Sequence, residues 1–336
     1  MRNLIILPIF LVVVLAACKN DDDNSSPYSE VTINMESNQG SDVYYSMANG
    51  EVNTVDRNEW DIAFSVPLQA ATILINEGKG LELYCVGDTN AWASVDANSI
   101  NGLKPRYNNK TDWTIGAFNL NAAAWPNYGW GTYHQGNPDY NVGGDSMYII
   151  KFPDNSLKKL MIRAKLGANS GNIIRTAGID GSNEFVDTLS TAPYNDLKNF
   201  IHYSLTTHQA VEAEPNMDEW DLLFTRYVEM VPGPGSILMP YPVTGVLINP
   251  NVTVAKVVGV AAEQAVETQS VNGYVSTTDV IGYDWKVFDQ QSQTYFITDN
   301  LSYFVKSVDG KKYQLYFTGY DGITAGTMTI KVKTVE

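Results

Sequence analysis

Two pairs of acidic residues have the spacing that carboxylate chemistry would need. Glu59 and Asp61 lie two residues apart, and Glu219 and Asp221 repeat the pair later in the chain. Side chains two apart on a strand point the same way, so each pair would project to one side, as glycosidase carboxylates must. Each pair nevertheless lies on one strand, with no further acid or base to name beside it. The pairs are better explained as polar strand-end positions next to a packed tryptophan, and we expect no enzyme activity.

The three histidines are the other side chains with ligand chemistry. His134 lies in a stretch rich in Trp and Tyr, where it is either a metal-binding side chain or a surface loop residue. His202 and His208 would lie about 20 Å apart along a regular strand, so they could not share one metal ion. Three His and two Cys are too few for a dense structural zinc site. The sequence also lacks the common nucleophile-elbow, P-loop and zinc-protease motifs. We therefore expect no metal site.

The elements that carry these residues occur twice. Glu59–Phe64 and Glu219–Phe224 share the order Glu-Trp-Asp, followed by apolar residues, at an offset of 160. An offset of 155 then holds without a gap over the 44 positions of 128–171, ten of them identical and mostly aromatic or Gly. The ten pairs are Tyr128/Tyr283, Trp130/Trp285, Gln135/Gln290, Tyr140/Tyr295, Tyr148/Tyr303, Lys151/Lys306, Asp154/Asp309, Leu160/Leu315, Gly167/Gly322 and Gly171/Gly326. Aromatic residues and Gly determine packing and turns, so the sequence predicts a duplicated unit whose paired residues have similar surroundings.

The pattern within each unit is that of an all-β fold. Apolar residues alternate along 60–64 and 220–224, which predicts strands with one buried face. The ranges 147–152 and 160–163 predict a hairpin, and 301–306 and 313–318 predict its counterpart, with Asp309-Gly310 as a type I′ turn. A third strand is expected at 172–175 and at 327–333. The best short helix candidate is 261–267.

The N-terminus has the pattern of an exported lipoprotein. Arg2 precedes the apolar run Leu4–Val14, which is too short to span a membrane and is typical of a secretory signal. Leu15-Ala16-Ala17-Cys18 resembles a lipobox, whose Cys is acylated, although a plain signal peptide is the alternative. The acidic run after Cys18 resembles the surface-export signal of Bacteroidetes lipoproteins. We expect a lipid-anchored outer-membrane protein that faces the cell exterior, with a periplasm-facing lipoprotein as the alternative.

Composition and length limit the remaining possibilities. The 336 residues carry a formal charge of −15 without a basic cluster, so nucleic acid is a poor partner. Cys85 is the only Cys after Cys18, which leaves no disulfide framework. The predicted organisation is a signal peptide (1–17), a lipidated Cys with an acidic tether (18–30), a first β module (31–175), a connecting segment (176–199) and a second β module (200–336).

Aromatic residues crowd the loop half of the first module. Trp125, Tyr128, Trp130 and Tyr133 lie among turn residues, where aromatic side chains commonly line a ligand face. Such rings can stack on a flat cofactor or on a sugar. A small aromatic core beneath long loops is the equally good alternative. We therefore treat these four residues as candidates for a ligand face.

The second module resembles the HmuY family of Bacteroidetes lipoproteins, which is typified by a haem-binding protein. The residues that carry the resemblance are 220–227 (Trp-Asp-Leu-Leu-Phe-Thr-Arg-Tyr), the Trp285–Phe288 strand and the closing hairpin 303–334. The first module, with Tyr44-Tyr45-Ser46 before Trp60-Asp61, is similar to a more divergent copy. The resemblance implies tandem antiparallel β modules and haem held between two axial side chains.

The sequence departs from that family at the expected axial ligand. The resemblance implies a His after the late Trp strand, where this chain has Phe288-Asp289-Gln290-Gln291. Gln is not a useful haem ligand. In the first module, His134 is one residue out of step with the position that matches Gln290, and one step on a strand reverses the side chain. His134 is thus the one haem-ligand candidate, without a clean match.

Three functions remain open from sequence. The first is an HmuY-like lipoprotein that binds haem or a related hydrophobic ligand and passes it to an outer-membrane uptake receptor. The second is a surface adhesin for carbohydrate or protein on the same scaffold, and the third is a hydrolytic enzyme. The first is expected, because no catalytic residues can be named.

Overall fold

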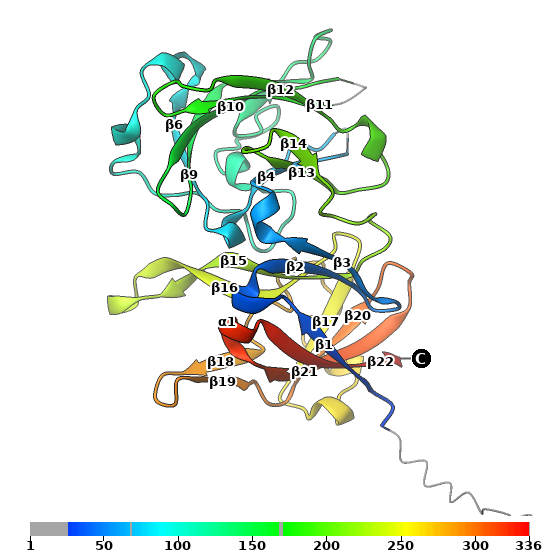
Figure 1. Ribbon diagram of the computed structural model, residues 1–336. Helices are drawn as coiled ribbons and strands as arrows, with labels where there is room; N and C mark the ends of the chain where they lie inside the picture. Colours follow the sequence, from blue (N-terminus) through cyan, green and yellow to red (C-terminus); the bar gives the residue numbers. More distant parts are fainter. Residues whose placement is uncertain (1–25, 68, 168–170, 336) are drawn as a thin grey trace, which may run out of the picture.

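The computed structural model describes residues 26–67, 69–167 and 171–335. The predicted signal peptide and the lipidation site Cys18 lie outside these residues. The described chain is nearly all β, as predicted, and its strands build two halves stacked one above the other (Figure 1). Its α-helix is the four-residue α1 (Gly322–Ala325), whereas the helix candidate 261–267 forms 3₁₀ turns. None of the described helices has the length and apolar character needed to cross a membrane.

The first half contains two antiparallel sheets around one apolar core. The larger sheet comprises β6 (Glu82–Asp88), β7 (Gly131–Tyr133), β8 (Val142–Gly144), β9 (Ser146–Lys151), β10 (Leu157–Lys165), β11 (Gly171–Gly178) and β12 (Phe185–Ser190). The smaller sheet comprises β4 (Ile62–Ser65), β5 (Ile73–Ile75), β13 (Phe200–Ser204) and β14 (Gln209–Val211). The core between them holds the fully buried Trp130, Phe118 and Tyr148. The range 176–199, predicted as a connector, supplies β12 to the larger sheet.

The second half repeats this plan. Its five-stranded sheet comprises β1 (Ser29–Asn34), β22 (Thr327–Val335), β21 (Lys312–Tyr320), β20 (Leu301–Lys306) and β17 (Thr253–Val258). Its four-stranded sheet comprises β16 (Leu238–Ile248), β15 (Leu222–Pro232), β2 (Ser41–Ser46) and β3 (Gly50–Asp56), and a separate hairpin joins β18 (Lys286–Asp289) to β19 (Thr294–Ile297). Trp285, Tyr303 and Phe224 lie in the core of this half.

The hairpin that begins each sequence repeat pairs with a strand of the other repeat. The β2–β3 hairpin precedes β4 in sequence, yet β2 pairs with β15 of the second half. The β13–β14 hairpin precedes β15, yet β13 pairs with β4 of the first half. Figure 1 shows β2 and β3 beside β15, and β13 and β14 beside β4. Strands from both predicted modules, 31–175 and 200–336, therefore contribute to each half.

A buried aspartate at matching positions holds each exchanged hairpin. The Asp221 carboxylate accepts hydrogen bonds from the backbone N–H groups of Met47 at 2.7 Å and Val308 at 2.8 Å. The Asp61 carboxylate accepts one from the backbone N–H of Leu205 at 2.7 Å. A buried N–H without a partner is costly, so a carboxylate placed against it stabilises the junction. The repeated Trp-Asp pair thus marks the place where a hairpin joins its half.

The later strands repeat in register as well as in sequence. Tyr148 of β9 faces Leu160 of β10, and Tyr303 of β20 faces Leu315 of β21. Both tyrosines are fully buried, and each donates a hydrogen bond to a main-chain carbonyl at 3.3 Å. β-bulges at positions 163 and 318 are also 155 apart. These contacts confirm the predicted equivalence of the two tyrosines.

The turn between β20 and β21 differs from the predicted type I′ turn. Gly310 has a φ of +81°, whereas Asp309 is not among the residues with positive φ. The N–H of Gly310 donates to the Ser307 carbonyl at 2.9 Å, and the N–H of Ser307 donates to the Lys311 carbonyl at 3.0 Å. This is a three-residue loop with a left-handed Gly. The hairpin is therefore confirmed, and its predicted turn type was wrong.

Hydrogen bonds join the two halves directly. The backbone N–H of Val228 in β15 donates to Glu77 Oε1 at 3.1 Å, and Trp113 Nε1 donates to the Ile248 carbonyl at 2.7 Å. Asn53 Nδ2 also donates to the Ala213 carbonyl at 2.8 Å. All four residues of β4 are buried, rather than alternate residues as its pattern predicts. The reason is that the second half covers the face of the small sheet that would otherwise meet water.

Candidate functional site

The four aromatic residues predicted as a ligand face in the first half do not form one surface. Trp130 is fully buried, and its Nε1 donates to the Ala71 carbonyl at 2.7 Å, so Trp130 belongs to the core. Trp125 is 70% exposed, and its ring lies 5.9 Å from that of Tyr133. Tyr128 packs partly buried against the core. The predicted face is thus divided between a core residue, two half-buried tyrosines and an exposed loop tryptophan.

His134 and the two acidic pairs do not come together at one site. His134 is exposed, and its ring meets Tyr140 edge-on at 5.6 Å. Glu59 and Glu219 are exposed, whereas Asp61 and Asp221 are buried in the hairpin junctions described above. A glycosidase-like pair would need both carboxylates at one reacting centre. Neither pair is arranged in this way. The described residues also contain no cluster of three or more His, Cys, Asp or Glu that could hold a metal ion.

A large groove lies instead in the second half, between the β15–β16 hairpin and the β18–β19 hairpin. It has a volume of about 850 Å³, which is within the range of pockets that hold cofactor-sized ligands. In Figure 1 both hairpins extend from the same side of the second half, with α1 between them. Five aromatic side chains line what we term the aromatic groove: Tyr241, Tyr283, Phe288, Tyr295 and Tyr320.

Two cations lie in the aromatic groove. The Lys286 ammonium is buried, lies 4.0 Å from the centre of the Trp285 ring, and donates a hydrogen bond to the Thr244 carbonyl. Burial lowers the pKa of Lys286 to about 7. Burial also lowers the pKa of Arg226, whose guanidinium has no ion-pair partner among the described residues. The one lining carboxylate, on Asp321, accepts a hydrogen bond from the Thr327 hydroxyl. The groove therefore favours a ligand with a flat apolar body and negative charge.

The aromatic groove corresponds to the predicted ligand face, but in the other copy. At the offset of 155, Tyr128 matches Tyr283 and Tyr133 matches Phe288, and both of these later residues line the groove. The sequence did not lead us to expect four of the lining residues at a site: Arg226, Lys286, Tyr295 and Tyr320. A signal was present: Arg226 and Lys286 lie in the two segments that carry the family resemblance, and Tyr140/Tyr295 is one of the ten identical pairs.

The first half fills the matching place with its own chain. Lys165, which matches Tyr320, directs its ammonium to the carbonyl of Ser65 at the end of β4 and to those of Pro67 and Ala70 in the β4–β5 loop. Gly131 stands at the position of Lys286, where a Cβ would approach the Gly143 carbonyl oxygen to 2.5 Å. β4 and β5 have four and three residues, against eleven in each of β15 and β16. The long wall and the Lys286 side chain of the groove thus have no counterpart in this part of the first half.

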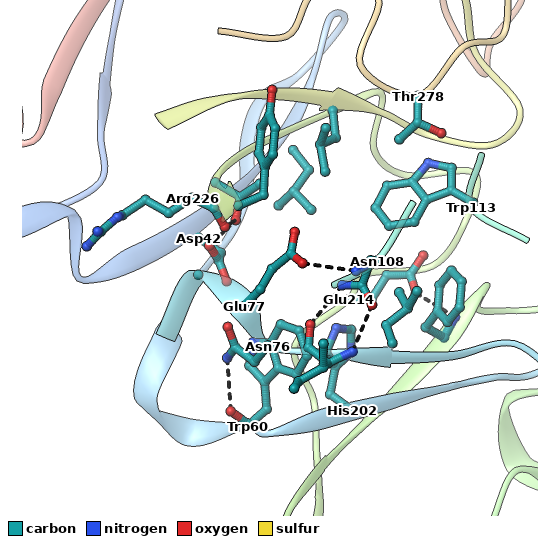
Figure 2. Close-up of a pocket in the computed structure, with 18 of the residues that line it drawn as sticks. Asp42, Trp60, Asn76, Glu77, Asn108, Trp113, His202, Glu214, Arg226 and Thr278 are labelled. Atoms are coloured by element: carbon teal, nitrogen blue, oxygen red, sulfur yellow. Dashed lines mark hydrogen bonds between the residues drawn. The ribbon is translucent and has the colours of Figure 1, made fainter. Parts of the chain in front are cut away.

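A second, much smaller cavity lies between the halves. Figure 2 shows Trp60, Trp113, His202 and Glu214 around it, with Arg226 directed away from its centre. Its volume is about 80 Å³, enough for a few water-sized molecules but far below that of a cofactor pocket. The Glu214 carboxylate accepts hydrogen bonds from the Phe200 N–H at 2.7 Å and Asn199 Nδ2 at 2.8 Å. We therefore assign this inter-half cavity to the packing between the halves.

Burial perturbs the titratable groups of the inter-half cavity. It raises the pKa of Glu214 to about 7 and lowers the pKa of His202 to about 3. It also lowers the pKa of Lys110 to about 7, although this ammonium forms an ion pair with Glu77. The charged forms of Glu214 and His202 are both disfavoured at this junction. We therefore expect pH to affect the stability of the protein through this cavity.

Comparisons with known proteins give little further information. No protein-family model matches the chain, and no curated protein matches it. One solved structure is similar, a Bacteroides vulgatus ATCC 8482 protein provisionally named as HmuY-like and haem-binding. That match has a TM-score of 0.17 and 17% identity, and it covers 39% of this chain and 82% of the other. At this level it carries no argument about function, and the description of the fold depends on the strands themselves.

Proposed function

We propose that this protein is a non-catalytic binding protein of the HmuY type, which captures haem or a related flat hydrophobic ligand in the aromatic groove. The observation that carries the proposal is the groove itself, an 850 Å³ space with five aromatic side chains and two cations. Aromatic faces stack on a conjugated ring, and Arg and Lys pair with its acidic side groups. Three lining residues, Arg226, Lys286 and Phe288, belong to the segments 220–227 and 285–288 that resemble the HmuY family.

A haemin titration of the purified protein, followed by absorbance, tests this function. We expect a Soret band that saturates at one haemin per chain. Phe288→Ala and Tyr241→Ala should weaken binding, because both rings line the groove. His134→Ala should leave it unchanged, because His134 lies on the first half. Absence of saturable binding would reject the proposal.

We further propose that acylated Cys18 anchors the protein in the outer membrane, where it faces the cell exterior and delivers its ligand to an uptake receptor. Several acyl chains on one Cys give stable anchoring, and the lipobox and the acidic tether support this location. Metabolic labelling with an alkyne fatty acid should label the wild type and not Cys18→Ala. Protease added to intact cells should digest the protein if it faces outwards and leave it intact if it faces the periplasm.

A specific feature favours a second function, adhesion to a protein or glycan. Large apolar side chains are exposed on both hairpins beside the groove, including Ile237 at 69%, Val287 at 59%, Leu238 at 57% and Phe296 at 57%. Exposed apolar clusters mark interaction surfaces. A glycan array and a haemin titration on the same preparation separate the two functions, since an adhesin would retain array binding without a Soret band.

A further inference from the structure

We propose that the aromatic groove recognises the flat face and the acidic groups of its ligand, so that it binds an iron-free porphyrin as well as haem. This inference rests on the proposed function and deepens it, because it names the chemistry by which the ligand is held. It departs from the axial coordination that the family resemblance implies.

The donor atoms of the groove do not suit haem iron. No His, Met or Cys is among the residues that line it, although these side chains and Tyr are the usual axial ligands. All three histidines lie in the first half: His134 on the surface, His202 edge-on to Trp60 at 4.5 Å, and His208 stacked on a phenylalanine at 4.0 Å. None of them is therefore available to the groove.

Three of the four tyrosines that line the groove are poor iron ligands as well. Burial raises the pKa of Tyr283, Tyr295 and Tyr320, which disfavours the phenolate form that ferric iron prefers. The hydroxyl of Tyr320 is already engaged, since it accepts a hydrogen bond from Gln39 Nε2. These three phenol rings consequently serve as faces for stacking rather than as iron ligands.

The cations give the groove its selectivity. Arg226 lines the groove without an ion-pair partner among the described residues, and Lys286 lies beneath Tyr320, 5.0 Å from the ring centre. A ligand carboxylate in the groove would lie near the Arg226 guanidinium and the Lys286 ammonium. The one lining carboxylate that could repel it, on Asp321, already accepts a hydrogen bond from the Thr327 hydroxyl. Charge-assisted hydrogen bonds are about twice as strong as neutral ones. Loss of the ligand's acidic groups should therefore weaken binding more than loss of its metal.

Three porphyrins test the inference: haemin, metal-free protoporphyrin IX and protoporphyrin IX dimethyl ester, all in the same detergent. Quenching of tryptophan fluorescence reports each affinity, because Trp285 lies directly beneath Lys286. We expect haemin and protoporphyrin IX to agree within about 3-fold and the ester to bind at least about 10-fold more weakly. If haemin binds at least about 10-fold more tightly than protoporphyrin IX, iron coordination dominates and the inference is overturned.

Variants assign the effect to the named cation. Arg226→Gln should remove most of the difference between acid and ester, whereas Arg163→Gln, an exposed arginine of the first half, should keep it. An acid-to-ester difference that survives in Arg226→Gln would contradict the role of this guanidinium. Failure of all three porphyrins to bind would reject the proposed function itself, which is distinct from the case where haemin alone binds.

Discussion

The two halves share one hydrogen-bonding frame but differ in what that frame carries. In each half a buried aspartate holds a hairpin, a buried tyrosine donates to a main-chain carbonyl, and a β-bulge follows at the same position. Above this frame, the second half extends two eleven-residue strands along a groove. The first half has short strands there, with Lys165 bound to their connecting loop. The frame and the aromatic groove are thus separable features.

The comparison also explains how the halves stay together. The first half is one continuous stretch from β4 to β14, whereas the second half combines β1–β3 with β15–β22. The chain therefore leaves the second half after β3 and returns to it at β15. The pairing of β1 with β22 then joins the two ends of the described chain within the second half. A cut between β14 and β15 would leave residues 222–335 without β1, β2 and β3.

The largest expected effect comes from the aspartates that hold the hairpins. Asp221→Ala should lower the free energy of unfolding by about 2–5 kcal/mol, because the buried N–H of Met47 and the partly buried N–H of Val308 lose their acceptor. Hydrogen exchange should then rise in 41–46 and not in 200–204, and Asp61→Ala should produce the reverse pattern. The exposed Asp180→Ala is the control and should change neither segment. If Asp221→Ala instead raised hydrogen exchange only in 200–204, the hairpin that precedes β15 in sequence, the pairing of β2 with β15 would be contradicted.

A loop graft tests whether the groove can be removed from the frame. Replacing 225–245 with the corresponding loop 65–72 should abolish porphyrin binding, by about 100-fold or more, since it removes the β15–β16 wall and Arg226. The core around Trp285 and Tyr303 should remain, so thermal unfolding should stay cooperative. Retained binding in a folded graft would place the ligand elsewhere.

The junction between the halves should respond to pH. The pKa of Glu214 is raised from 4.5 to about 7 in the folded state, so the folded protein binds this proton more tightly than the unfolded one. Its contribution to stability is present below about pH 4.5 and is lost as pH rises through 7. Glu214→Gln should therefore gain about 1–3 kcal/mol over wild type on going from pH 4.5 to 8. Denaturant unfolding at several pH values measures this difference.

His202 titrates in the same cavity with the opposite sign. Its pKa is lowered from 6.5 to about 3, so its contribution to stability grows as pH rises from 3 to 6.5. Wild type and Glu214→Gln share this contribution of His202, so the difference in stability between them reports the contribution of Glu214 alone. If the difference in free energy of unfolding between wild type and Glu214→Gln stays the same at every pH, Glu214 is not the group that makes stability depend on pH.

The smallest expected effect compares a matched pair of rings. Phe288→Ala should weaken ligand binding by about 3–10-fold, because one stacking face is lost. Tyr133→Ala, 155 positions earlier, should change it by less than about 2-fold. Fluorescence titration of both variants measures the contrast. Equal losses would mean that both halves contribute to the ligand site.

The fold could be predicted from sequence because its signals are local. Alternating apolar residues and the repeat at 155 gave the strands, the hairpins and the equivalence of Tyr148 and Tyr303. The exchange of hairpins could not be predicted. Tyr44-Tyr45-Ser46 and His202-Tyr203-Ser204 are nearly the same strand, so either is chemically suited to pair with β4 or β15.

The ligand-face candidates named from sequence lie in the first copy, whereas the groove on which the proposed function rests lies in the second. Residues shared by both copies, such as Tyr128 and Tyr283, do not indicate which half keeps a groove. The deciding features are the length of the β15–β16 strands and the side chain at the position of Lys165 and Tyr320. Their effect depends on contacts between segments far apart in the sequence, such as that between Lys165 and the β4–β5 loop.

Stoichiometry tests most directly whether one half alone keeps the ligand groove. Native mass spectrometry of the protein with excess protoporphyrin IX should show one ligand per chain, and Phe288→Ala with Arg226→Gln should remove it, while Tyr133→Ala with His134→Ala should not. Two ligands per chain, or one ligand that persists in the groove variant and disappears in the first-half variant, would contradict the division of roles between the halves.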